Sequence, residues 1–217
     1  MWQRIVIFLF LLIPLLVSPA SLSAGQTRGV AVTSGTGSGG ASWGTYHALI
    51  IGINKYKEWS PLQTAVKDAT VLRNVLVEQY GFDEKNVILR VDKDATRSRI
   101  IRDLRYLAGG LKDGDNLLIY YAGHGQLDDL TGDGYWIPVE GKLKDPSTWV
   151  SNGILKGVLS SQKVTAKNVV VIADSCYSGS LLREGPSMLT VAERDYQEKL
   201  EKAAALRSRQ VISSGGV

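Results

Sequence analysis

The sequence predicts an α/β protein built as a three-layer α/β/α sandwich around a mostly parallel sheet. Short apolar runs typical of buried strands alternate along the chain with longer segments whose apolar residues recur every three or four positions. Strands that alternate with helices pair in parallel through right-handed crossovers, which puts helices on both faces of the sheet. A length of 217 residues, with 44% hydrophobic and 21% charged residues, fits one globular domain.

The first half of the domain is predicted to contain two strands and two helices. The strands are residues 47–52 and 86–91, and the helix between them ends at Gly81. This helix begins with a capping box formed by Ser60, Pro61 and Gln63. Its apolar stripe, at helical spacing, consists of Ala65, Ala69, Leu72, Leu76 and Tyr80. The second helix starts at a Thr96 cap and ends near two glycines, Gly109 and Gly110.

The second half supplies three more strands and a short helix. One strand lies within residues 116–125 and carries His124, the other two are residues 167–173 and 209–213, and the helix lies within residues 151–162. Residues 169–173 carry no charge, which predicts a strand buried on both faces of the sheet. Residues 181–208 are charged and helix-prone, as in a solvated helix.

The two ends of the chain differ from the domain in composition. Residues 1–24 contain Arg4, an apolar run at 5–17 and a small-residue end, which predicts a secretory signal peptide and export to a periplasmic or extracellular space. The run is shorter than the roughly 20 residues of a spanning helix, so no stable membrane anchor is expected, although an uncleaved anchor is the alternative. Residues 25–45, rich in Gly, Ser and Thr, predict a flexible linker before a domain at 46–217.

Two reactive side chains follow two of the apolar runs. His124 stands between two glycines after one run, and Cys176, the only cysteine, comes shortly after another. Because ligands bind outside the carboxyl ends of parallel strands, we expect His124 and Cys176 to meet at one edge of the sheet. An unpaired thiol in an exported chain is better explained by reactivity than by packing, although a small buried hydrophobe is the alternative. His47 lies within a strand and is assigned a structural role.

Six motifs in one order resemble those of caspase-like cysteine peptidases of the metacaspase type. They span roughly residues 46–217 and are H-A-L-I-I-G-I-N at 47–54, V-K-D-A at 66–69, Y-Y-A-G-H-G at 120–125, G-D-G-Y-W-I-P at 132–138, D-S-C-Y-S-G at 174–179 and S-R-Q-V-I-S-S-G-G at 208–216. The separation between histidine and cysteine is 176 − 124 = 52 residues. Caspases have a catalytic histidine about 50 residues before the cysteine.

The resemblance implies a cysteine endopeptidase that works with a His124–Cys176 dyad. It assigns the oxyanion hole to the backbone N–H groups of Gly125 and Cys176, and the floor of the first specificity pocket to Asp174. A carboxylate there selects substrates with Lys or Arg before the cut. Asp68 matches a second acidic pocket residue, although it falls in the predicted first helix. Asp174 as a cap of the turn after its strand is the alternative.

One departure from the family pattern lies close to this pocket. Metacaspases often have serine two residues before the histidine, whereas this chain has Ala122. Position 122 of this chain therefore has no side-chain hydroxyl to make the pocket hydrogen bond that such a serine would make.

No cofactor is expected, and calcium is the one metal considered. Asp128, Asp129 and Asp133 lie in one loop, but three loop carboxylates are more often solvated. Calcium-dependent metacaspases also use aspartates after the cysteine, where this chain has Arg183 and Glu184. The net charge of +4 is scattered and no nucleic-acid motif accompanies it, so the expected partners are protein or peptide substrates with Arg or Lys, and no nucleic acid.

The resemblance also predicts that the chain is C-terminally truncated. Family members continue for another strand and two helices, and the segment at 181–208 corresponds to a linker open to self-processing. Residues 25–217 alone are therefore expected to aggregate or dimerise and to show weak activity until the missing segment is supplied as a partner. A catalytically silent binding or scaffolding module is the main alternative. A small-molecule hydrolase is disfavoured because no G-x-S-x-G motif is present.

Overall fold

The main sheet consists of five parallel strands in the order β2-β1-β3-β7-β8. The structure is a computed structural model that describes residues 44–175 and 207–214. The strands are β1 (Tyr46–Gly52), β2 (Val87–Val91), β3 (Asn116–Ala122), β7 (Asn168–Asp174) and β8 (Ser208–Ser213). All five strands were predicted from the sequence. The observed ends of β1, β2, β7 and β8 lie within one residue of the predicted ones, whereas β3 ends at Ala122 and does not include His124 as predicted.

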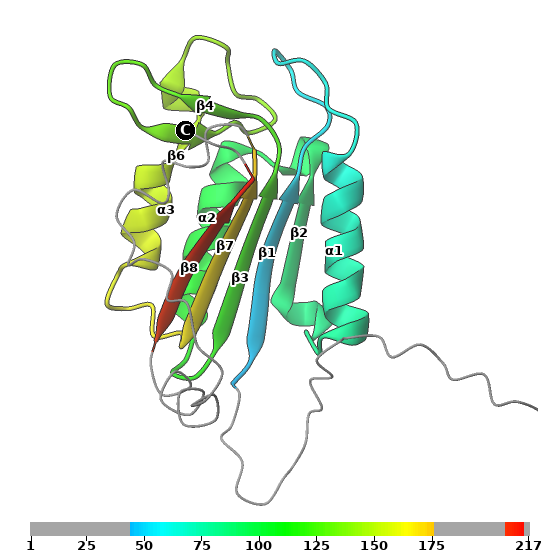
Figure 1. Ribbon diagram of the computed structural model, residues 1–217, viewed down its shortest axis with the longest axis vertical. Helices are drawn as coiled ribbons and strands as arrows, with labels where there is room; N and C mark the ends of the chain where they lie inside the picture. Colours follow the sequence, from blue (N-terminus) through cyan, green and yellow to red (C-terminus); the bar gives the residue numbers. More distant parts are fainter. Residues whose placement is uncertain (1–43, 176–206, 215–217) are drawn as a thin grey trace, which may run out of the picture. The chain divides into compact units, whose positions relative to one another are not determined.

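Helices cover both faces of this sheet, which confirms the predicted α/β sandwich (Figure 1). Helix α1 (Ala65–Gln79) lies on one face, whereas α2 (Arg97–Gly110) and α3 (Asn152–Leu159) lie on the other. Three single turns of 3-10 helix, η1 (Glu84–Asn86), η2 (Asp92–Asp94) and η3 (Pro146–Thr148), connect these elements. From β1 the chain moves outward to β2, then returns across β1 to β3, so the strand order reverses between β1 and β3.

A second, antiparallel sheet stands at the carboxyl end of the main one (Figure 1). It contains β4 (Gly125–Leu127), β5 (Gly134–Trp136) and β6 (Val150–Ser151). Sequence reasoning described this region as a loop and missed all three strands. Strands of two or three residues are too short to show an alternating pattern.

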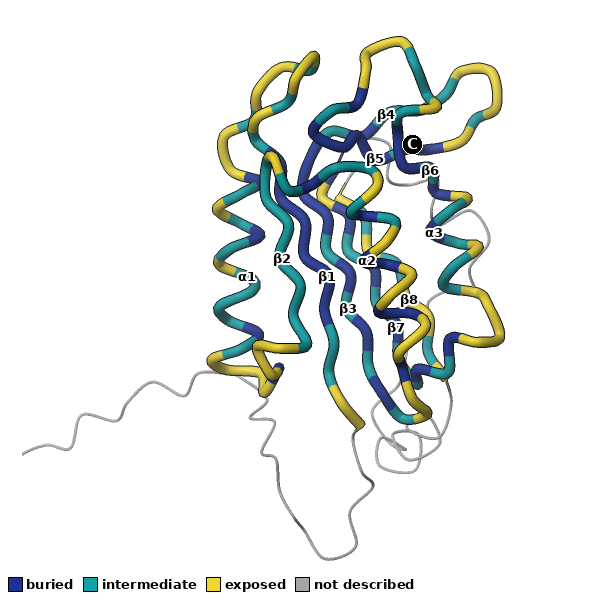
Figure 2. The backbone as a smooth tube through the Cα atoms, turned by 180° about the vertical axis from the view of Figure 1, so that it is seen from behind, coloured by how far each residue is buried: buried dark blue, intermediate teal, exposed yellow. Residues whose placement is uncertain are grey.

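The core forms two apolar clusters, one on each face of the main sheet. Buried residues are concentrated along the strands of this sheet (Figure 2). On the α1 side, the buried members are Ala48, Ile50, Ala69, Leu76 and Phe82. The larger cluster lies on the side of α2 and α3 and includes Leu49, Ile51, Leu104, Tyr121 and Trp136. Residues 169–173 were predicted to be buried on both faces, and this is wrong: burial alternates along β7. The reason is that α1 packs against β1, β2 and β3, so its cover does not extend over β7.

The start of α1 also differs from its prediction. The helix begins at Ala65 after Thr64, whose side chain makes no capping hydrogen bond. Asn54 replaces the predicted capping box: its Oδ1 accepts a hydrogen bond from Val66 N at 3.2 Å, and its backbone O accepts one from Leu62 N at 2.9 Å. The predicted Thr96 cap of α2 is confirmed, since its Oγ1 accepts from Arg99 N at 3.3 Å.

Several predictions concern parts of the chain outside the described residues. The signal peptide at 1–24, most of the linker at 25–45 and the segment at 181–206 belong to this group, as does Cys176. Within residues 44–175 and 207–214, no helix is long and apolar enough to cross a membrane.

Candidate active site

His124 lies where the strand order reverses, beyond the carboxyl ends of β1 and β3. In an open parallel sheet the loops that leave such a switch point turn to opposite faces and leave a crevice between them. The loop after β1, residues 53–64, carries Tyr56, Trp59 and Ser60, and the turn after β3 carries His124. These two segments, distant in sequence, meet around the imidazole ring of His124.

One ring nitrogen of His124 contacts the main chain of the β1–α1 loop. The distance from His124 Nε2 to the backbone O of Ser60 is 2.8 Å. A carbonyl oxygen can only accept, so this hydrogen bond requires a proton on Nε2. In the neutral ring the lone pair then resides on Nδ1, which makes Nδ1 the basic nitrogen.

Two tyrosines hold the backbone of His124. Its N–H donates to the Tyr56 hydroxyl at 2.8 Å, and its carbonyl accepts from the Tyr121 hydroxyl at 2.6 Å. The Tyr56 and Tyr121 hydroxyls also influence each other's pKa. Desolvation by burial raises the pKa of Tyr56 to about 12, so this hydroxyl stays protonated at neutral pH.

Two aromatic rings pack against the imidazole of His124. The centroid of the His124 ring is 4.8 Å from that of Tyr56 and 5.5 Å from that of Trp59. Trp59 in turn packs edge-on against Trp149 at 5.9 Å, which joins the β1–α1 loop to the segment before β6. The imidazole therefore has few orientations available to it.

The glycines on either side of His124 serve different purposes. A Cβ on Gly123 would lie 2.5 Å from the Tyr56 hydroxyl oxygen and 2.6 Å from that of Tyr121, so only glycine fits beneath the two hydroxyls. Gly125 opens β4 opposite Trp136, and the hydrogen bond from Ile137 N to His124 O marks this as a non-hydrogen-bonded pair. The N–H of Gly125 consequently points away from β5 and is left to other acceptors.

Polar side chains fix the loop that carries Tyr56 and Trp59. Asp92 Oδ1 accepts hydrogen bonds from the backbone N–H groups of Asn54 at 2.8 Å and Lys55 at 2.9 Å. Asp92 has a positive φ of 44°, which turns its carboxylate from the end of β2 toward this loop. Lys57 N donates to Val139 O at 3.0 Å. The loop is thereby attached to β2 and to the segment after β5.

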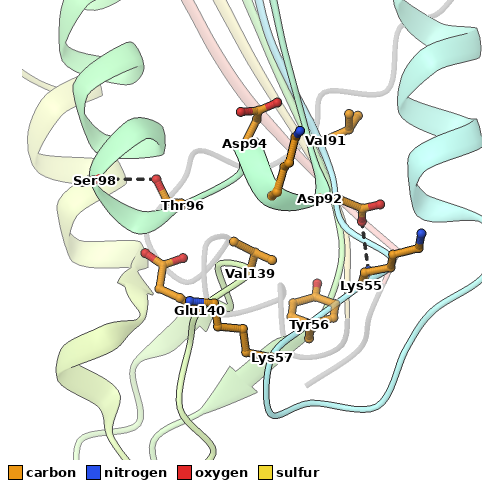
Figure 3. Close-up of a pocket in the computed structure, with 11 residues that line it drawn as sticks. Lys55, Tyr56, Lys57, Val91, Asp92, Asp94, Thr96, Ser98, Val139 and Glu140 are labelled. Atoms are coloured by element: carbon orange, nitrogen blue, oxygen red, sulfur yellow. Dashed lines mark hydrogen bonds between the residues drawn. The ribbon is translucent and has the colours of Figure 1, made fainter.

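A pocket of about 790 Å³ opens beside this loop, and Tyr56 is part of its lining whereas His124 is not (Figure 3). Three lysines and three acidic residues also line it, which are Lys55, Lys57, Lys93, Asp92, Asp94 and Glu140. All three carboxylates already bond the protein: Asp92 binds the loop amides, Glu140 Oε1 accepts from Arg97 N at 2.9 Å, and Asp94 pairs with Arg99. The lining has no excess of either charge.

Asp174 and Asp68, the predicted pocket carboxylates, both lie near one tyrosine. Burial, and after it the negative charges of Asp174 and Asp68, raise the pKa of Tyr120 to about 12, so both carboxylates are electrostatically coupled to this hydroxyl. Asp174 ends β7 opposite Ala122 of β3, and Asp68 lies in the first turn of α1. Asp68 is thus within the helix and still faces the carboxyl edge of the sheet.

Asp174 is exposed and bonded through both its main chain and its side chain. Its Oδ1 accepts a hydrogen bond from the Ser214 hydroxyl at 2.6 Å, and its backbone O accepts one from Gly123 N at 3.3 Å. The second bond ties the end of β7 to the turn that carries His124. Cys176 follows Asp174 by two residues, as His124 follows Ala122, but it lies outside the described residues.

Sequence reasoning missed four residues of this site. They are Tyr56, Trp59, Ser60 and Tyr120. The first three contact His124, and Tyr120 is coupled electrostatically to Asp174 and Asp68, yet none of the four stands beside a reactive side chain in sequence. His47 lies at the opposite, amino end of β1, where its Nε2 is 3.5 Å from Asp115 Oδ2. It takes no part in the site.

The acidic loop between β4 and β5 shows local hydrogen bonding. Asp128 Oδ1 accepts from Leu130 N at 2.9 Å, and Gly132 N donates to Asp128 O at 2.7 Å. In the part of the chain that the structure describes, no group of three or more His, Cys, Asp or Glu side chains is arranged to hold a metal ion.

Comparisons with known proteins agree with this architecture. The family model described as caspase domain matches residues 45–212. Metacaspase-1 of Pyricularia oryzae is 32% identical over 158 residues, which is 64% of this chain and 38% of the relative. Metacaspase-6 of Arabidopsis thaliana is 30% identical over 155 residues, covering 65% of this chain and 40% of the relative. The chain thus spans about two fifths of the length of these curated relatives.

A solved structure shows the same fold. The crystal structure of a Geobacter sulfurreducens protein superposes with a TM-score of 0.51 and 27% sequence identity, over 64% of this chain and 53% of the other. The family match covers most of the chain, including both strands that lead to His124 and Asp174. The chain belongs to the caspase-domain family and is similar to the metacaspases of that family.

Proposed function

We propose that this protein is a cysteine endopeptidase that uses His124 and Cys176 as its dyad and cuts after Arg or Lys. The observation that carries the proposal is the hydrogen bond from His124 Nε2 to the Ser60 carbonyl, at 2.8 Å. It leaves Nδ1 as the base, at a sheet edge where the segment bearing Cys176 also emerges.

The reaction assigned to the dyad is acyl transfer. Nδ1 of His124 takes the proton of the Cys176 thiol, and the sulfur forms a bond to the carbonyl carbon of the substrate. The C–N bond then breaks and the imidazolium gives its proton to the leaving amine. Water, deprotonated by the same nitrogen, attacks the thioester and releases the acid together with the thiol.

The oxyanion of each tetrahedral intermediate needs donors that are already in place. The Gly125 N–H suits this role because the ladder to β5 does not use it. It belongs to the residue after His124, so the oxyanion would lie close to the base. The second donor in the proposal is the N–H of Cys176.

The preference for basic side chains follows from the carboxylates at this edge. Asp174 and Asp68 both couple to the Tyr120 hydroxyl, so their negative charges act on the same small region. A cationic side chain long enough to enter the crevice would be attracted by both. Protein or peptide substrates with Arg or Lys before the cut are therefore the proposed partners.

We also propose that the protein is exported through the signal peptide at residues 1–24. The support is the sequence pattern described above: a basic start, a short apolar run and small residues. N-terminal sequencing of protein recovered from outside the cytoplasm should give a start shortly after residue 20. A start at residue 1 in the cytoplasmic fraction would contradict export.

The dyad is tested by covalent labelling. An arginyl chloromethylketone should add one adduct to Cys176, seen by peptide mass mapping, and hydrolysis of an arginyl fluorogenic peptide should stop with it. Cys176→Ala and His124→Ala should each lose hydrolysis while keeping the circular dichroism spectrum, because the two residues act as a unit. Tyr106→Phe on the exposed face of α2 is the control.

Two outcomes would contradict the proposal. Hydrolysis that survives Cys176→Ala would show that another nucleophile acts. A folded protein that neither reacts with the label nor cleaves basic peptides would instead be a silent binding module.

A further inference from the structure

We propose that the hydroxyl of Tyr120 is a third polar group of the basic-residue pocket and makes it prefer Arg over Lys. This inference rests on the proposed function. It concerns the first residue of the Y-Y-A-G-H-G motif, to which the sequence analysis assigned no role, on the same face of the sheet as the two carboxylates.

Strand register puts Tyr120 next to Asp174. Ala122 of β3 pairs with Asp174 of β7, and Tyr120 pairs with Ile172. Residues two apart on a strand share a face, so Tyr120 and Asp174 are diagonal neighbours on adjacent strands. Diagonal neighbours lie about 7–8 Å apart at the backbone, within reach of a tyrosine side chain.

Helix α1 supplies the second carboxylate to the same face. Tyr120 packs against the apolar cluster on the α1 side of the sheet, whose buried members include Ala69. Asp68 directly precedes Ala69 in the first turn of the helix. The close packing of α1 on β1 at Gly52 fixes this turn, since a Cβ there would lie 2.5 Å from Ala65 O.

The hydroxyl keeps its proton in this setting. Burial is the main cause that raises the pKa of Tyr120 to about 12, and the charges of Asp174 and Asp68 add to it. At neutral pH the group is therefore one donor with two acceptor lone pairs. Donation to one carboxylate leaves the oxygen free to accept a hydrogen bond from a ligand.

Such an acceptor matters more for arginine than for lysine. A guanidinium carries five N–H donors in a rigid plane, whereas an ammonium carries three on a rotating head. Two carboxylates can pair with all three N–H groups of a rotating ammonium. The fixed plane of a guanidinium lets each carboxylate bind one edge through two N–H groups, so two carboxylates pair with four of its five N–H groups. Ala122, the β3 residue opposite Asp174, has no polar side-chain atom, so Tyr120 is the next group on this face of β3 that can accept the remaining N–H.

Tyr120→Phe tests this directly, because phenylalanine keeps the ring that packs on α1 and removes only the oxygen. We expect kcat/KM for a peptide ending in Arg to fall about tenfold, and that for the matched Lys peptide to fall less than about twofold, since an unpaired N–H is costly. Tyr106→Phe, on the exposed face of α2, is the matched control and should leave both values unchanged.

A binding measurement separates this inference from the proposed function. Calorimetry should show that the wild-type protein binds agmatine, which carries a guanidinium at one end and an ammonium at the other, several-fold more tightly than cadaverine, which carries an ammonium at each end. Tyr120→Phe should erase the difference whether or not the protein hydrolyses peptides. Failure to cleave any basic peptide, with this binding difference intact, would overturn the peptidase proposal alone.

The inference about Tyr120 is overturned by either of two results. One is an unchanged Arg-to-Lys ratio in Tyr120→Phe, in hydrolysis or in binding. The other is an equal fall for both substrates, which would give the hydroxyl a merely structural role.

Discussion

Tyr56 acts on His124 through the main chain rather than through the ring nitrogens. Its hydroxyl accepts the His124 N–H at 2.8 Å, and its ring lies 4.8 Å from the imidazole. Because burial raises the pKa of Tyr56 to about 12, its state does not change over the working pH range of a peptidase. Tyr56 is therefore a positioning residue, and its loss should show in the turnover step.

Tyr56→Phe should lower kcat for an arginyl peptide about tenfold and leave KM within about twofold, because His124 loses an anchor while the basic-residue pocket is intact. The free energy of unfolding should fall by about 1 kcal/mol, the net value of one hydrogen bond. Stopped assays and urea unfolding measure the two effects. An unchanged kcat would show that Tyr121 alone is enough to hold the His124 backbone.

Asp174 is exposed, which moderates the effect expected from removing its charge. Asp174→Asn keeps the shape and should lower kcat/KM for both Arg and Lys peptides by about 1–2 kcal/mol, or roughly 5- to 30-fold. Asp68→Asn should act in the same direction but less strongly. Measurements of kcat/KM at low and high salt test the size of this electrostatic effect. If Asp174→Asn cleaves Arg peptides at an undiminished rate, the role of Asp174 is to cap the turn after its strand.

At the scale of elements, the contact of α1 with β1 determines where Asp68 lies. A Cβ at position 52 would come within 2.5 Å of Ala65 O and 2.6 Å of Ala69 Cβ, and a backbone oxygen cannot move aside cheaply. Only glycine therefore lets the first turn of α1 approach the end of β1.

Gly52→Ala should reduce the free energy of unfolding by about 1–3 kcal/mol, the usual effect of overpacking. Gly109→Ala, within α2 and with no atom within 4 Å of its added Cβ, is the matched control and should stabilise by about 0.5–1 kcal/mol. Chemical denaturation of the two variants gives the comparison. Equal stability would mean that α1 moves away freely.

The elements themselves were largely predictable from the sequence, whereas the contacts between them were not. Apolar runs located β1, β3 and β7, and the Thr96 cap located α2, because those signals are local. The cap of α1 was missed because Asn54 lies 12 residues from Val66, its hydrogen-bond partner. Strands β4 to β6 were missed because pairing, not sequence pattern, defines strands so short.

The same division applies to the candidate site. His124 and Asp174 stand at strand ends, and the structure puts both at the carboxyl edge as predicted. Tyr56 and Ser60 could not be identified, since their roles depend on how a long loop folds back over His124. Tyr120 reads in sequence as one more apolar strand residue, and only the register with β7 reveals its neighbours.

At the scale of the whole molecule, Asp115 joins the amino ends of several elements. Its carboxylate accepts hydrogen bonds from Thr45 N at 2.9 Å and Lys112 N at 2.8 Å, and lies 3.5 Å from His47 Nε2. Its backbone O accepts from Lys167 N at 2.7 Å, just before β7. Three strands thus begin around a single buried residue, at the opposite end of the sheet from His124.

The pKa of Asp115 predicts how stability changes in acid. Desolvation acts to raise it, but the hydrogen bonds from Lys112 and Thr45 and the nearby His47 outweigh that effect, so the pKa lies below its usual 3.8. A depressed folded-state pKa gives stability that is present above the unfolded-state pKa and is lost as pH falls through the folded-state value.

Asp115→Asn should therefore lower the free energy of unfolding at pH 7 by about 1–3 kcal/mol, since an amide N–H would face donors. The difference in free energy of unfolding between wild type and variant should become smaller as the pH falls below 4. Thermal melts between pH 3 and pH 7 measure it. A difference in free energy of unfolding that does not depend on pH would show that the charge of the Asp115 carboxylate contributes nothing to stability.

The main-chain partner of His124 has a consequence for how this site tolerates mutation. A backbone carbonyl oxygen is present whatever side chain stands at position 60. Substitutions at that position therefore cannot remove the group that orients the His124 imidazole. Damage must come instead from changes that alter the path of the chain, such as insertions in residues 53–64 or loss of the Asn54 and Asp92 anchors. Surveys that compare side chains alone would register two reactive residues here and overlook the third participant, which is inherited as loop geometry rather than as an amino acid.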